Sequence, residues 1–549
     1  MSSFKLWKSK KIFILPFISG IILTLTLIYS ELFFLLFFFL VPFLVFIEEA
    51  KNKKEAFVGG FLMSFIYSIS SLFIVLWPSQ EFSNLLSNYQ DLELLKGNFF
   101  LLTLFLILSP IVSLIYGFFA LGTFFAFNLF KDRKLYLFIL VPLFWIITEF
   151  LKRKIFFDLS WGDIGYNLVD FTFFVNTAKI WGRQGLAFLI IVFNLLIYFI
   201  FKRRINLIKG AVLLIFISIS VSILGFYLIK QTYKSLAQKY KIKIAVLQGY
   251  IPWTVSKYWP DRNEPFTFPS PYDKLLEKLP NDLDIILLPE EVLNFNPIEI
   301  STPGFPTRVL NDNFYFSDEK RQVMEILKKT GAKIFIIGQP VIFDRNLYGN
   351  SFLIFDNKGN VGSYVKKRLF PLVEKPVLHI KLKYFTTDYT PGSVSPFMKI
   401  RDDFIIFLSN CIEIESDDLT NKFLGTGPSI ILNGGSEIGF REYAQRYQLK
   451  LARFRAVEQD KFLATAKKAG YSAIIDPTGK VLKISNYTRE DNFLIEEVYL
   501  KAGKTFYSKI GKFNNLIFSI LSLLFFIFII YAKRLLKKSE HTSSKLKEE

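Results

Sequence analysis

The segment FIIFLSNCIEI, residues 404–414, is an apolar run that ends at the only cysteine of the chain, Cys411. Such a run is typical of a strand that is buried on both faces of a sheet. Two amphipathic stretches, 317–330 and 437–459, predict helices. Strands of this kind with helices between them favour an α/β domain in which helices cover layered sheets. Similar apolar runs lie at 242–249, 284–291, 332–343, 428–435, 462–470 and 492–500.

The composition excludes several chemistries. Of the 549 residues, 52% are hydrophobic and 17% aromatic, but only one is Cys and two are His. An internal disulfide cannot form, and zinc sites of Cys and His or iron–sulfur clusters lack ligands. A Ser-His-Asp mechanism would have to use His379 or His541, and His541 lies in a charged tail. We therefore expect no metal and no cofactor.

The first 230 residues are dominated by apolar runs of the length that a membrane-spanning helix needs, about 20 residues. Any one of the short runs could be a buried helix of a soluble protein, but the set as a whole argues against that interpretation. The first run resembles a signal peptide, yet another span follows it at once, and we expect it to be retained. We predict about eight transmembrane helices, at 12–30, 32–47, 56–77, 99–127, 135–150, 186–201, 210–229 and 514–532.

The distribution of Lys and Arg predicts how the chain crosses the membrane. Positive residues in short loops favour the cytoplasmic side. With eight spans, the basic start, the basic end and three basic loops all fall on one side, whereas the run 152–154 is an exception on the other side. We therefore expect cytoplasmic termini, a transmembrane domain over 1–230, an exported domain over 231–510, and a last helix with a basic tail over 511–549. Because much of the net charge of +20 lies in these loops, we expect a bilayer and no nucleic acid as partner.

Three reactive side chains follow predicted strands. Glu290 follows Pro289 at the end of DIILLPEE. Lys366 lies where the chain leaves a predicted strand in the segment 361–374. Cys411 is the last residue of FIIFLSNC. A thiol with a pKa of about 8.5 is only slightly ionised at neutral pH, so it needs a base to act as a nucleophile. A carboxylate can take the thiol proton, and an ammonium can stabilise the thiolate and an oxyanion. These residues could replace the His that the sequence lacks.

Each residue also has an ordinary structural interpretation. A lone cysteine at a strand end is commonly a small buried residue. Glu290 beside Glu291 is commonly a strand end or a solvated pair, and Lys366 beside two further basic residues is commonly part of a basic face. Composition and spacing alone leave these alternatives open.

The order of the motifs resembles a known family. Pro289-Glu290 after an apolar strand, the pattern Y-x-K-x-x-L-x-P-x-x-E over 364–374, and Cys411-x-Glu413 follow one another along the chain. They resemble the Glu-Lys-Cys signature of the carbon–nitrogen hydrolase (nitrilase) superfamily, whose domain is an α-β-β-α sandwich. With seven spans before it and one after it, the arrangement resembles more narrowly the apolipoprotein N-acyltransferases.

The resemblance implies an acyltransferase that works through a cysteine thioester. Glu290 would be the general base, Lys366 the oxyanion stabiliser and Cys411 the nucleophile. Glu374 and Glu413 match supporting positions of the family, and Asn350 would orient Glu or Lys. A phospholipid of the bacterial inner membrane would donate the acyl chain, and the α-amine of a diacylglyceryl lipoprotein would accept it, on the periplasmic side.

The sequence departs from the family pattern around these residues. Leu288 stands where the family has Trp before the Pro-Glu pair, and Ile412 stands where it has Tyr after the Cys. The family's D-x-W-F stretch is 433–436 here, and its glycine-asparagine run is Lys467-Lys468-Ala469-Gly470. These departures affect the expected substrate pocket and leave the three reactive residues in place.

Other functions compete with this prediction. A membrane-anchored amidase or nitrilase would need fewer helices than the seven that precede the domain. A transporter would place ionisable residues inside the spans, where the sequence has almost none beyond Glu149. An inactive scaffold would be expected to lose Glu290, Lys366 or Cys411, and all three are present.

Overall fold

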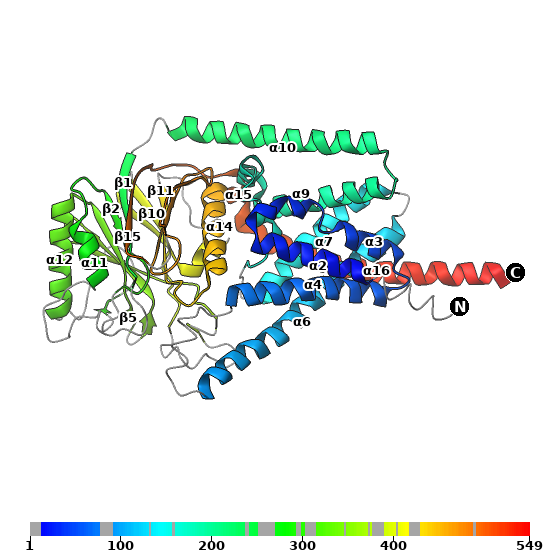
Figure 1. Cartoon of the computed structure of the whole chain (residues 1–549), viewed down its shortest axis with the longest axis horizontal. Coiled ribbons are helices and arrows are strands. Elements are labelled where there is room, and N and C mark those ends of the chain that lie inside the picture. The colour runs from blue at the N-terminus through cyan, green and yellow to red at the C-terminus, as the bar shows by residue number, and fades with distance from the viewer. Residues whose placement is uncertain are drawn as a thin grey trace. The chain divides into compact units, whose positions relative to one another are not determined.

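The computed structural model describes residues 13–76, 92–130, 133–155, 160–236, 241–250, 270–292, 298–301, 303, 314–344, 347–371, 374–375, 389–401, 404–416, 429–486 and 490–548. The chain forms two compact units, and Figure 1 shows their elements. One unit contains the N-terminal helices, the segment Leu95–Phe226 and the residues from Phe513 onward. The other contains Tyr227–Lys512.

The first unit is helical. Within its described residues, seven helices are long and apolar enough to cross a membrane. They cover Ser30–Glu49, Lys53–Leu72, Leu106–Leu129, Lys134–Ile155, Ala178–Phe201, Leu207–Leu236 and Asn514–Leu536. The elements themselves are α2 (Ile14–Ile28), η1 (Ser30–Phe37), α3 (Val41–Glu49), α4 (Lys53–Leu76), α6 (Leu92–Leu129), α7 (Lys134–Ile155), η2 (Ile164–Leu168), α8 (Thr172–Asn176), α9 (Ala178–Phe201), α10 (Leu207–Leu236) and α16 (Asn514–Glu548).

Seven of the eight expected spans are confirmed as apolar helices of sufficient length. The remaining one, expected at 12–30, is α2, which has 15 residues. At 1.5 Å per residue it is about 22 Å long, less than the ~30 Å of a bilayer core. The span expected at 32–47 is also irregular: a 3₁₀ segment, η1, leads into α3, whose first turn contains Pro42. Proline lacks the N–H that would continue the hydrogen-bond ladder from the preceding segment.

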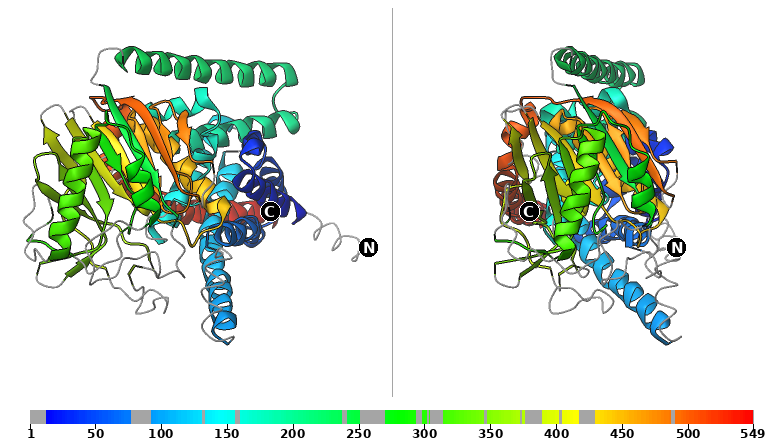
Figure 2. Two further views of the ribbon diagram at one scale, coloured as in Figure 1. Left: turned by 60° about the vertical axis from the view of Figure 1, so that its left-hand side comes forward. Right: turned by 90° about the vertical axis from the view of Figure 1, so that its left-hand side faces the viewer.

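The second unit is a sandwich of two six-stranded sheets (Figures 1 and 2). The first sheet has the order β15-β1-β2-β4-β7-β8, and the second has the order β14-β13-β12-β11-β10-β9. The strands of the first sheet are β1 (Lys241–Gln248), β2 (Ile285–Leu287), β4 (Ile334–Gly338), β7 (Ser351–Asp356), β8 (Val361–Val365) and β15 (Asn492–Tyr499). Those of the second are β9 (Phe397–Arg401), β10 (Phe404–Asn410), β11 (Ser429–Gly435), β12 (Leu463–Lys467), β13 (Ala473–Ile475) and β14 (Val481–Ile484). A small third sheet has the order β3 (Ile298–Glu299), β5 (Val341–Phe343), β6 (Leu347–Gly349).

Alternate residues of the strands fill different layers of the core. Along β1, Ala245 and Leu247 face the layer between the first sheet and the helices, whereas Ile244 and Val246 face the other sheet. This follows from the period of two residues in a strand. Because both faces are covered, the strands are continuously apolar, which explains the pattern seen in the sequence.

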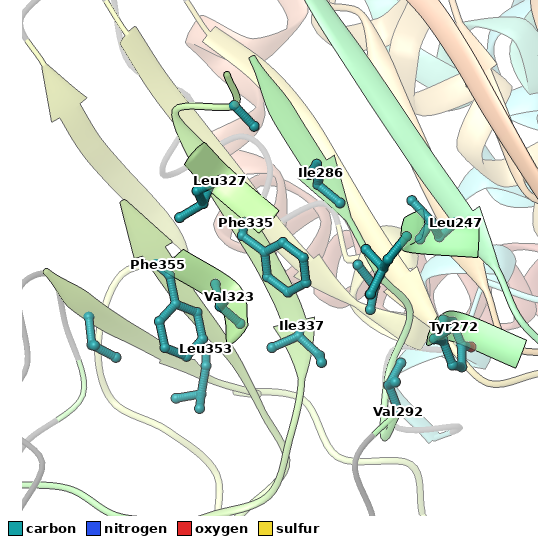
Figure 3. Packing of buried hydrophobic residues seen from close by; sticks show 14 of the residues in the cluster. Leu247, Tyr272, Ile286, Val292, Val323, Leu327, Phe335, Ile337, Leu353 and Phe355 are labelled. Atoms are coloured by element: carbon teal, nitrogen blue, oxygen red, sulfur yellow. The ribbon is translucent and has the colours of Figure 1, made fainter. Parts of the chain in front are cut away.

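Helices cover both outer faces, so that the layers run α-β-β-α (Figure 1). The helices α11 (Ser270–Glu277) and α12 (Phe314–Thr330) pack on the first sheet. Figure 3 shows Val323 and Leu327 of α12 against Phe335 and Phe355 of the sheet. On the second sheet, α14 (Glu442–Gln459) contributes Ala452 and Ala456 to a smaller cluster, and α15 (Phe506–Ile510) follows the last strand. The predicted fold class is confirmed: an α-helical unit with several apolar helices joined to an α/β sandwich.

Candidate active site

The candidate residues lie at one edge of the sandwich because the strands that carry them end there. In the first sheet β1, β2 and β4 are parallel, and in the second sheet β10, β11 and β12 are parallel. Residues that follow the carboxyl ends of parallel strands gather at the same edge. Glu290 lies three residues after β2, Lys366 directly follows β8, and Cys411 directly follows β10.

A close approach of two backbones fixes Glu290. The N–H of Gly338 at the end of β4 donates to the Pro289 carbonyl at 3.0 Å, and the Val292 N–H donates to the Gly338 carbonyl at 3.0 Å. A Cβ atom at Gly338 would come within 2.6 Å of the Glu290 Cα. Glycine is therefore required at 338, and it lets the loop after β2 lie against β4.

The buried centre of the site is a network of charged hydrogen bonds around Lys366. Its Nζ donates to Glu290 Oε1 at 3.0 Å and to Glu374 Oε1 at 2.9 Å. The Nδ2 of Asn350 donates to the same two oxygens, at 2.5 and 2.6 Å. The backbone N–H of Ser436, after β11, donates to Glu290 Oε2 at 3.0 Å. All four side chains are buried, so the network has few alternatives to the geometry shown.

This network keeps Glu290 and Lys366 ionised. Burial raises the pKa of Glu290, but the charge of Lys366 and the hydrogen bonds from Asn350, Lys366 and Ser436 outweigh burial and hold that pKa below its usual value. Burial lowers the pKa of Lys366, but the charges of Glu290 and Glu374 raise it well above its usual value. The site therefore holds a carboxylate and an ammonium side by side at neutral pH.

The Glu413 carboxylate ties the nucleophile loop to the lysine loop. It accepts hydrogen bonds from the backbone N–H of Asn410 at 2.8 Å and of Lys367 at 2.6 Å. It also accepts from the hydroxyl of Tyr364 at 2.9 Å and from the Arg368 N–H at 3.1 Å. Because these donors lie immediately next to Cys411 and Lys366, Glu413 sets the distance between the ends of β10 and β8.

Cys411 begins a short 3₁₀ helix, η4 (Cys411–Glu415), in an unusual backbone conformation. Its φ is +52°, a region that a non-glycine residue adopts only when its surroundings require it. The residue is partly exposed. Desolvation and the negative charge of Glu290 raise the pKa of the thiol, whereas the charges of Lys366 and Lys467 lower it, and the net shift is upward. The thiol therefore needs a base to take its proton before it can attack.

The structure brings all six sequence-predicted residues into one site. The network above contains Glu290, Lys366, Glu374 and Asn350, and the amide of Asn410 donates to Asn350 Oδ1 at 3.0 Å, which connects the network to the residue before Cys411. Sequence reasoning missed Asn410 and the backbone N–H of Ser436. It included Tyr364 only as part of a motif. No periodicity or motif in the sequence marks the first two.

The departures from the family pattern have structural explanations. Leu288 and Ile412 are both buried, and Leu288 belongs to the core between the first sheet and its helices. Lys467 pairs with Glu437 at 2.8 Å, and the Lys468 Nζ donates to the Glu291 carbonyl at 2.9 Å. Within the described part of the chain, no group of three or more His, Cys, Asp or Glu side chains could hold a metal ion.

Two family models match the chain. A model of the apolipoprotein N-acyltransferase N-terminal domain matches residues 19–196, and a model of the carbon–nitrogen hydrolases matches residues 281–504. The chain belongs to the apolipoprotein N-acyltransferase family. An apolipoprotein N-acyltransferase of Wigglesworthia glossinidia brevipalpis is 27% identical over 78% of this chain and 83% of its own length. Apolipoprotein N-acyltransferase 1 of Treponema denticola is 23% identical over 91% of this chain and 92% of its own length.

Solved structures of nitrilase-superfamily proteins are similar to about half of this apolipoprotein N-acyltransferase family member. Nit3 of Saccharomyces cerevisiae has a TM-score of 0.35 and 16% identity, over 47% of this chain and 90% of its own. An amidase of Nesterenkonia sp. AN1 has a TM-score of 0.35 and 17% identity, over 47% of this chain and 90% of its own.

The hydrogen bond from Asn350 to Glu290 should appear in the pH dependence of stability. A carboxyl group whose pKa is lowered by folding stabilises the protein above its unfolded pKa, and this stabilisation is lost as the pH falls. Asn350→Ala removes one cause of the lowering. We expect it to reduce the free energy of unfolding by about 1.5–3 kcal/mol at neutral pH and by less near pH 4, measured by thermal unfolding.

Asn433→Ala is the matched control, because its amide donates to the carbonyls of Ser409 and Cys411 and to no carboxylate. Its cost should be the same at both pH values. An equal cost for Asn350→Ala at both pH values would contradict the assignment.

Proposed function

We propose that this chain transfers a fatty acyl chain from a membrane phospholipid to the α-amine of the N-terminal S-diacylglyceryl cysteine of a lipoprotein. The observation that carries the proposal is the buried Glu290–Lys366–Glu374 network beside the only cysteine of the chain. Membership of the apolipoprotein N-acyltransferase family supports the same reaction.

In the first step Glu290 takes the proton of the Cys411 thiol, and the sulfur attacks the ester carbonyl of the phospholipid. The carbonyl oxygen becomes an oxyanion, which the ammonium of Lys366 stabilises. When the carbon–oxygen bond breaks, the leaving alkoxide takes the proton back from Glu290 and departs as a lysophospholipid. Cys411 is left as an S-acyl thioester.

In the second step the free α-amine of the lipoprotein attacks the thioester carbonyl. Glu290 takes a proton from the attacking amine, and the carbon–sulfur bond breaks. The departing sulfur recovers the proton from Glu290, so that the thiol is restored and an amide has formed. A thioester suits this step because an amine attacks it more readily than an oxygen ester. The acyl-enzyme must also be kept from water, which would hydrolyse it.

The supporting residues act by position. Glu374 accepts a second hydrogen bond from the Lys366 ammonium, and the Phe370 N–H donates to Glu374 Oε2 at 2.6 Å. Asn350 joins both carboxylates, and Glu413 holds the two loops that carry Lys366 and Cys411. Each would affect the rate by moving or discharging a member of the triad.

The helices provide the reason for transfer to a lipid-linked acceptor. Both proposed substrates are lipids, so a soluble domain would meet neither of them in quantity. The part of α10 from Tyr227 onward belongs to the same compact unit as the sandwich, and Thr232 Oγ1 in it donates to Asp460 Oδ1 at 2.9 Å. The apolar helix α10 thus continues into the unit that contains Cys411. We infer a multi-pass protein of the bacterial inner membrane with the sandwich on the periplasmic side.

A covalent acyl adduct tests the first step. Purified protein incubated with phospholipid vesicles should gain the mass of one fatty acyl chain, because Cys411 forms the thioester and no other cysteine exists. Hydroxylamine should remove the adduct, and Cys411→Ser should show no hydroxylamine-sensitive adduct. Intact-mass spectrometry provides the measurement.

Lys333→Gln is a matched lysine control for Lys366→Gln, since Lys333 pairs with Asp284 at the opposite end of β4. Lys366→Gln should lower the rate of adduct formation by at least about 100-fold, and Lys333→Gln should leave it unchanged. Absence of the adduct with every phospholipid tried would count against the proposal.

The orientation in the membrane is tested by fusions to alkaline phosphatase, which is active only after export. A fusion at Ile300 should be active, and fusions after Lys54 and after Lys209 should be inactive, because these two residues lie in the basic segments between the predicted spans. An inactive, stably expressed fusion at Ile300 would contradict a periplasmic site.

A further inference from the structure

A second lysine, Lys467, ends a strand close to the nucleophile. In the second sheet, Asn410 of β10 pairs with Gly434 of β11, and Gly435 of β11 pairs with Lys467 of β12, all in parallel register. Cys411 and Lys467 therefore flank Gly435 at the same edge of the sheet. The triad proposed above does not use this lysine.

Gly435 leaves the space in which the two residues approach each other. A Cβ atom at this position would lie 2.9 Å from Lys467 Nζ and 3.4 Å from Cys411 Cα. Both atoms thus lie next to the same small volume, which glycine leaves open. A larger residue at 435 would displace the ammonium from the neighbourhood of the cysteine.

Lys467 is a buried ion held by a buried partner. Its Nζ lies 2.8 Å from Glu437 Oε1, and both side chains are almost fully buried. Gly470, with φ of +129°, lies against the Glu437 carboxylate and leaves room for it. A buried ion pair contributes little net stability, because the loss of hydration offsets the attraction between the charges. A contribution to fold stability is therefore a weak explanation for the presence of this ion pair beside Cys411.

The charge balance around Cys411 gives the pair a role. Glu290 and Glu374 act on the thiol as negative charges, and Lys366 and Lys467 act on it as positive charges, all from neighbouring elements. Glu413 lies on the thiol's own element, and Glu437 is paired with Lys467. Lys366 already donates to both Glu290 and Glu374, so its charge is shared between two carboxylates. Lys467 is the second positive charge beside the sulfur.

We propose that Lys467, held in place by Glu437, is a second cation that stabilises negative charge on the Cys411 sulfur. The inference rests on the proposed function and adds a positioning pair to it. Lys467 transfers no proton: in each step the proton still moves to and from Glu290. The ammonium favours the sulfur anion when the thiol is deprotonated, and again when the carbon–sulfur bond of the thioester breaks. Glu437 holds the Lys467 ammonium beside Gly435.

The ionisation behaviour of Lys467 agrees with this role. Burial lowers its pKa, but the charge of Glu437 and that of the Cys411 thiolate outweigh burial, so that the pKa lies above its usual value. The side chain thus remains an ammonium across the neutral range.

The pH dependence of Cys411 alkylation tests the proposal without any lipid. Iodoacetamide labels only this cysteine, because the chain has no other. In Lys467→Gln the midpoint of the alkylation rate should move to higher pH by about one unit, so that labelling at neutral pH falls about tenfold. Lys467→Arg should restore most of the rate. The full-length protein in detergent is used throughout.

Two further variants separate charge from folding. Lys467→Gln combined with Glu437→Gln removes both buried ions, so it should recover thermal stability but keep slow alkylation at neutral pH. Lys461→Gln is the matched control, because Lys461 is equally buried at the other end of β12 and donates to the carbonyls of Lys501 and Gly503. Its alkylation midpoint should equal that of the wild type.

An unchanged midpoint in Lys467→Gln and in its combination with Glu437→Gln would overturn the inference, and the acyl adduct could still form and support the proposed function. A shifted midpoint in a protein that never forms the acyl adduct would uphold the electrostatic role of Lys467 and reject the lipid reaction. The alkylation assay therefore tests the role of Lys467, and the adduct assay tests the proposed function, independently of each other.

Discussion

The site depends on the burial of one ammonium, that of Lys366, between the carboxylates of Glu290 and Glu374. The lysine side chain is 1% exposed, and removing its ammonium would leave two carboxylates uncompensated in the interior. Breaking a buried pair in this way typically costs about 3–5 kcal/mol. Glu290 follows β2 and Lys366 follows β8, and two strands, β4 and β7, lie between them in the first sheet, so this interaction joins distant positions along the sheet's edge.

The second sheet is connected to this centre through backbone groups. Ser436 donates to Glu290, Asn410 donates to Asn350, and Glu413 accepts from residues on both sides of the sandwich. The strained backbone of Cys411 is a consequence, because hydrogen bonds hold the preceding residue, Asn410, to both Asn350 and Glu413. In the proposed mechanism, three strand ends provide a base, an oxyanion stabiliser and a nucleophile, and the packing of the two sheets fixes the positions of these residues.

The sequence predicted the strands that appear as continuous apolar runs. The runs at 242–249, 404–414 and 428–435 became β1, β10 and β11, because a strand covered on both faces must be apolar throughout. The pair of Lys467 and Glu437 escaped prediction, since a charged residue at the end of one strand and another that follows a neighbouring strand carry no sign of their contact. The strands β3, β5 and β6 are too short to show a period, and the shortness of α2 depends on where a helix ends, which hydropathy does not specify.

The central claim is that an acyl group passes from Cys411 to an amine rather than to water. It is tested by isolating the acylated protein and adding a diacylated lipopeptide, once with a free α-amine and once with that amine acetylated. The account predicts that the free-amine peptide removes the acyl chain from the protein and gains its mass, whereas the acetylated peptide does neither. Release of free fatty acid at the same rate with both peptides would contradict the account and indicate a hydrolase.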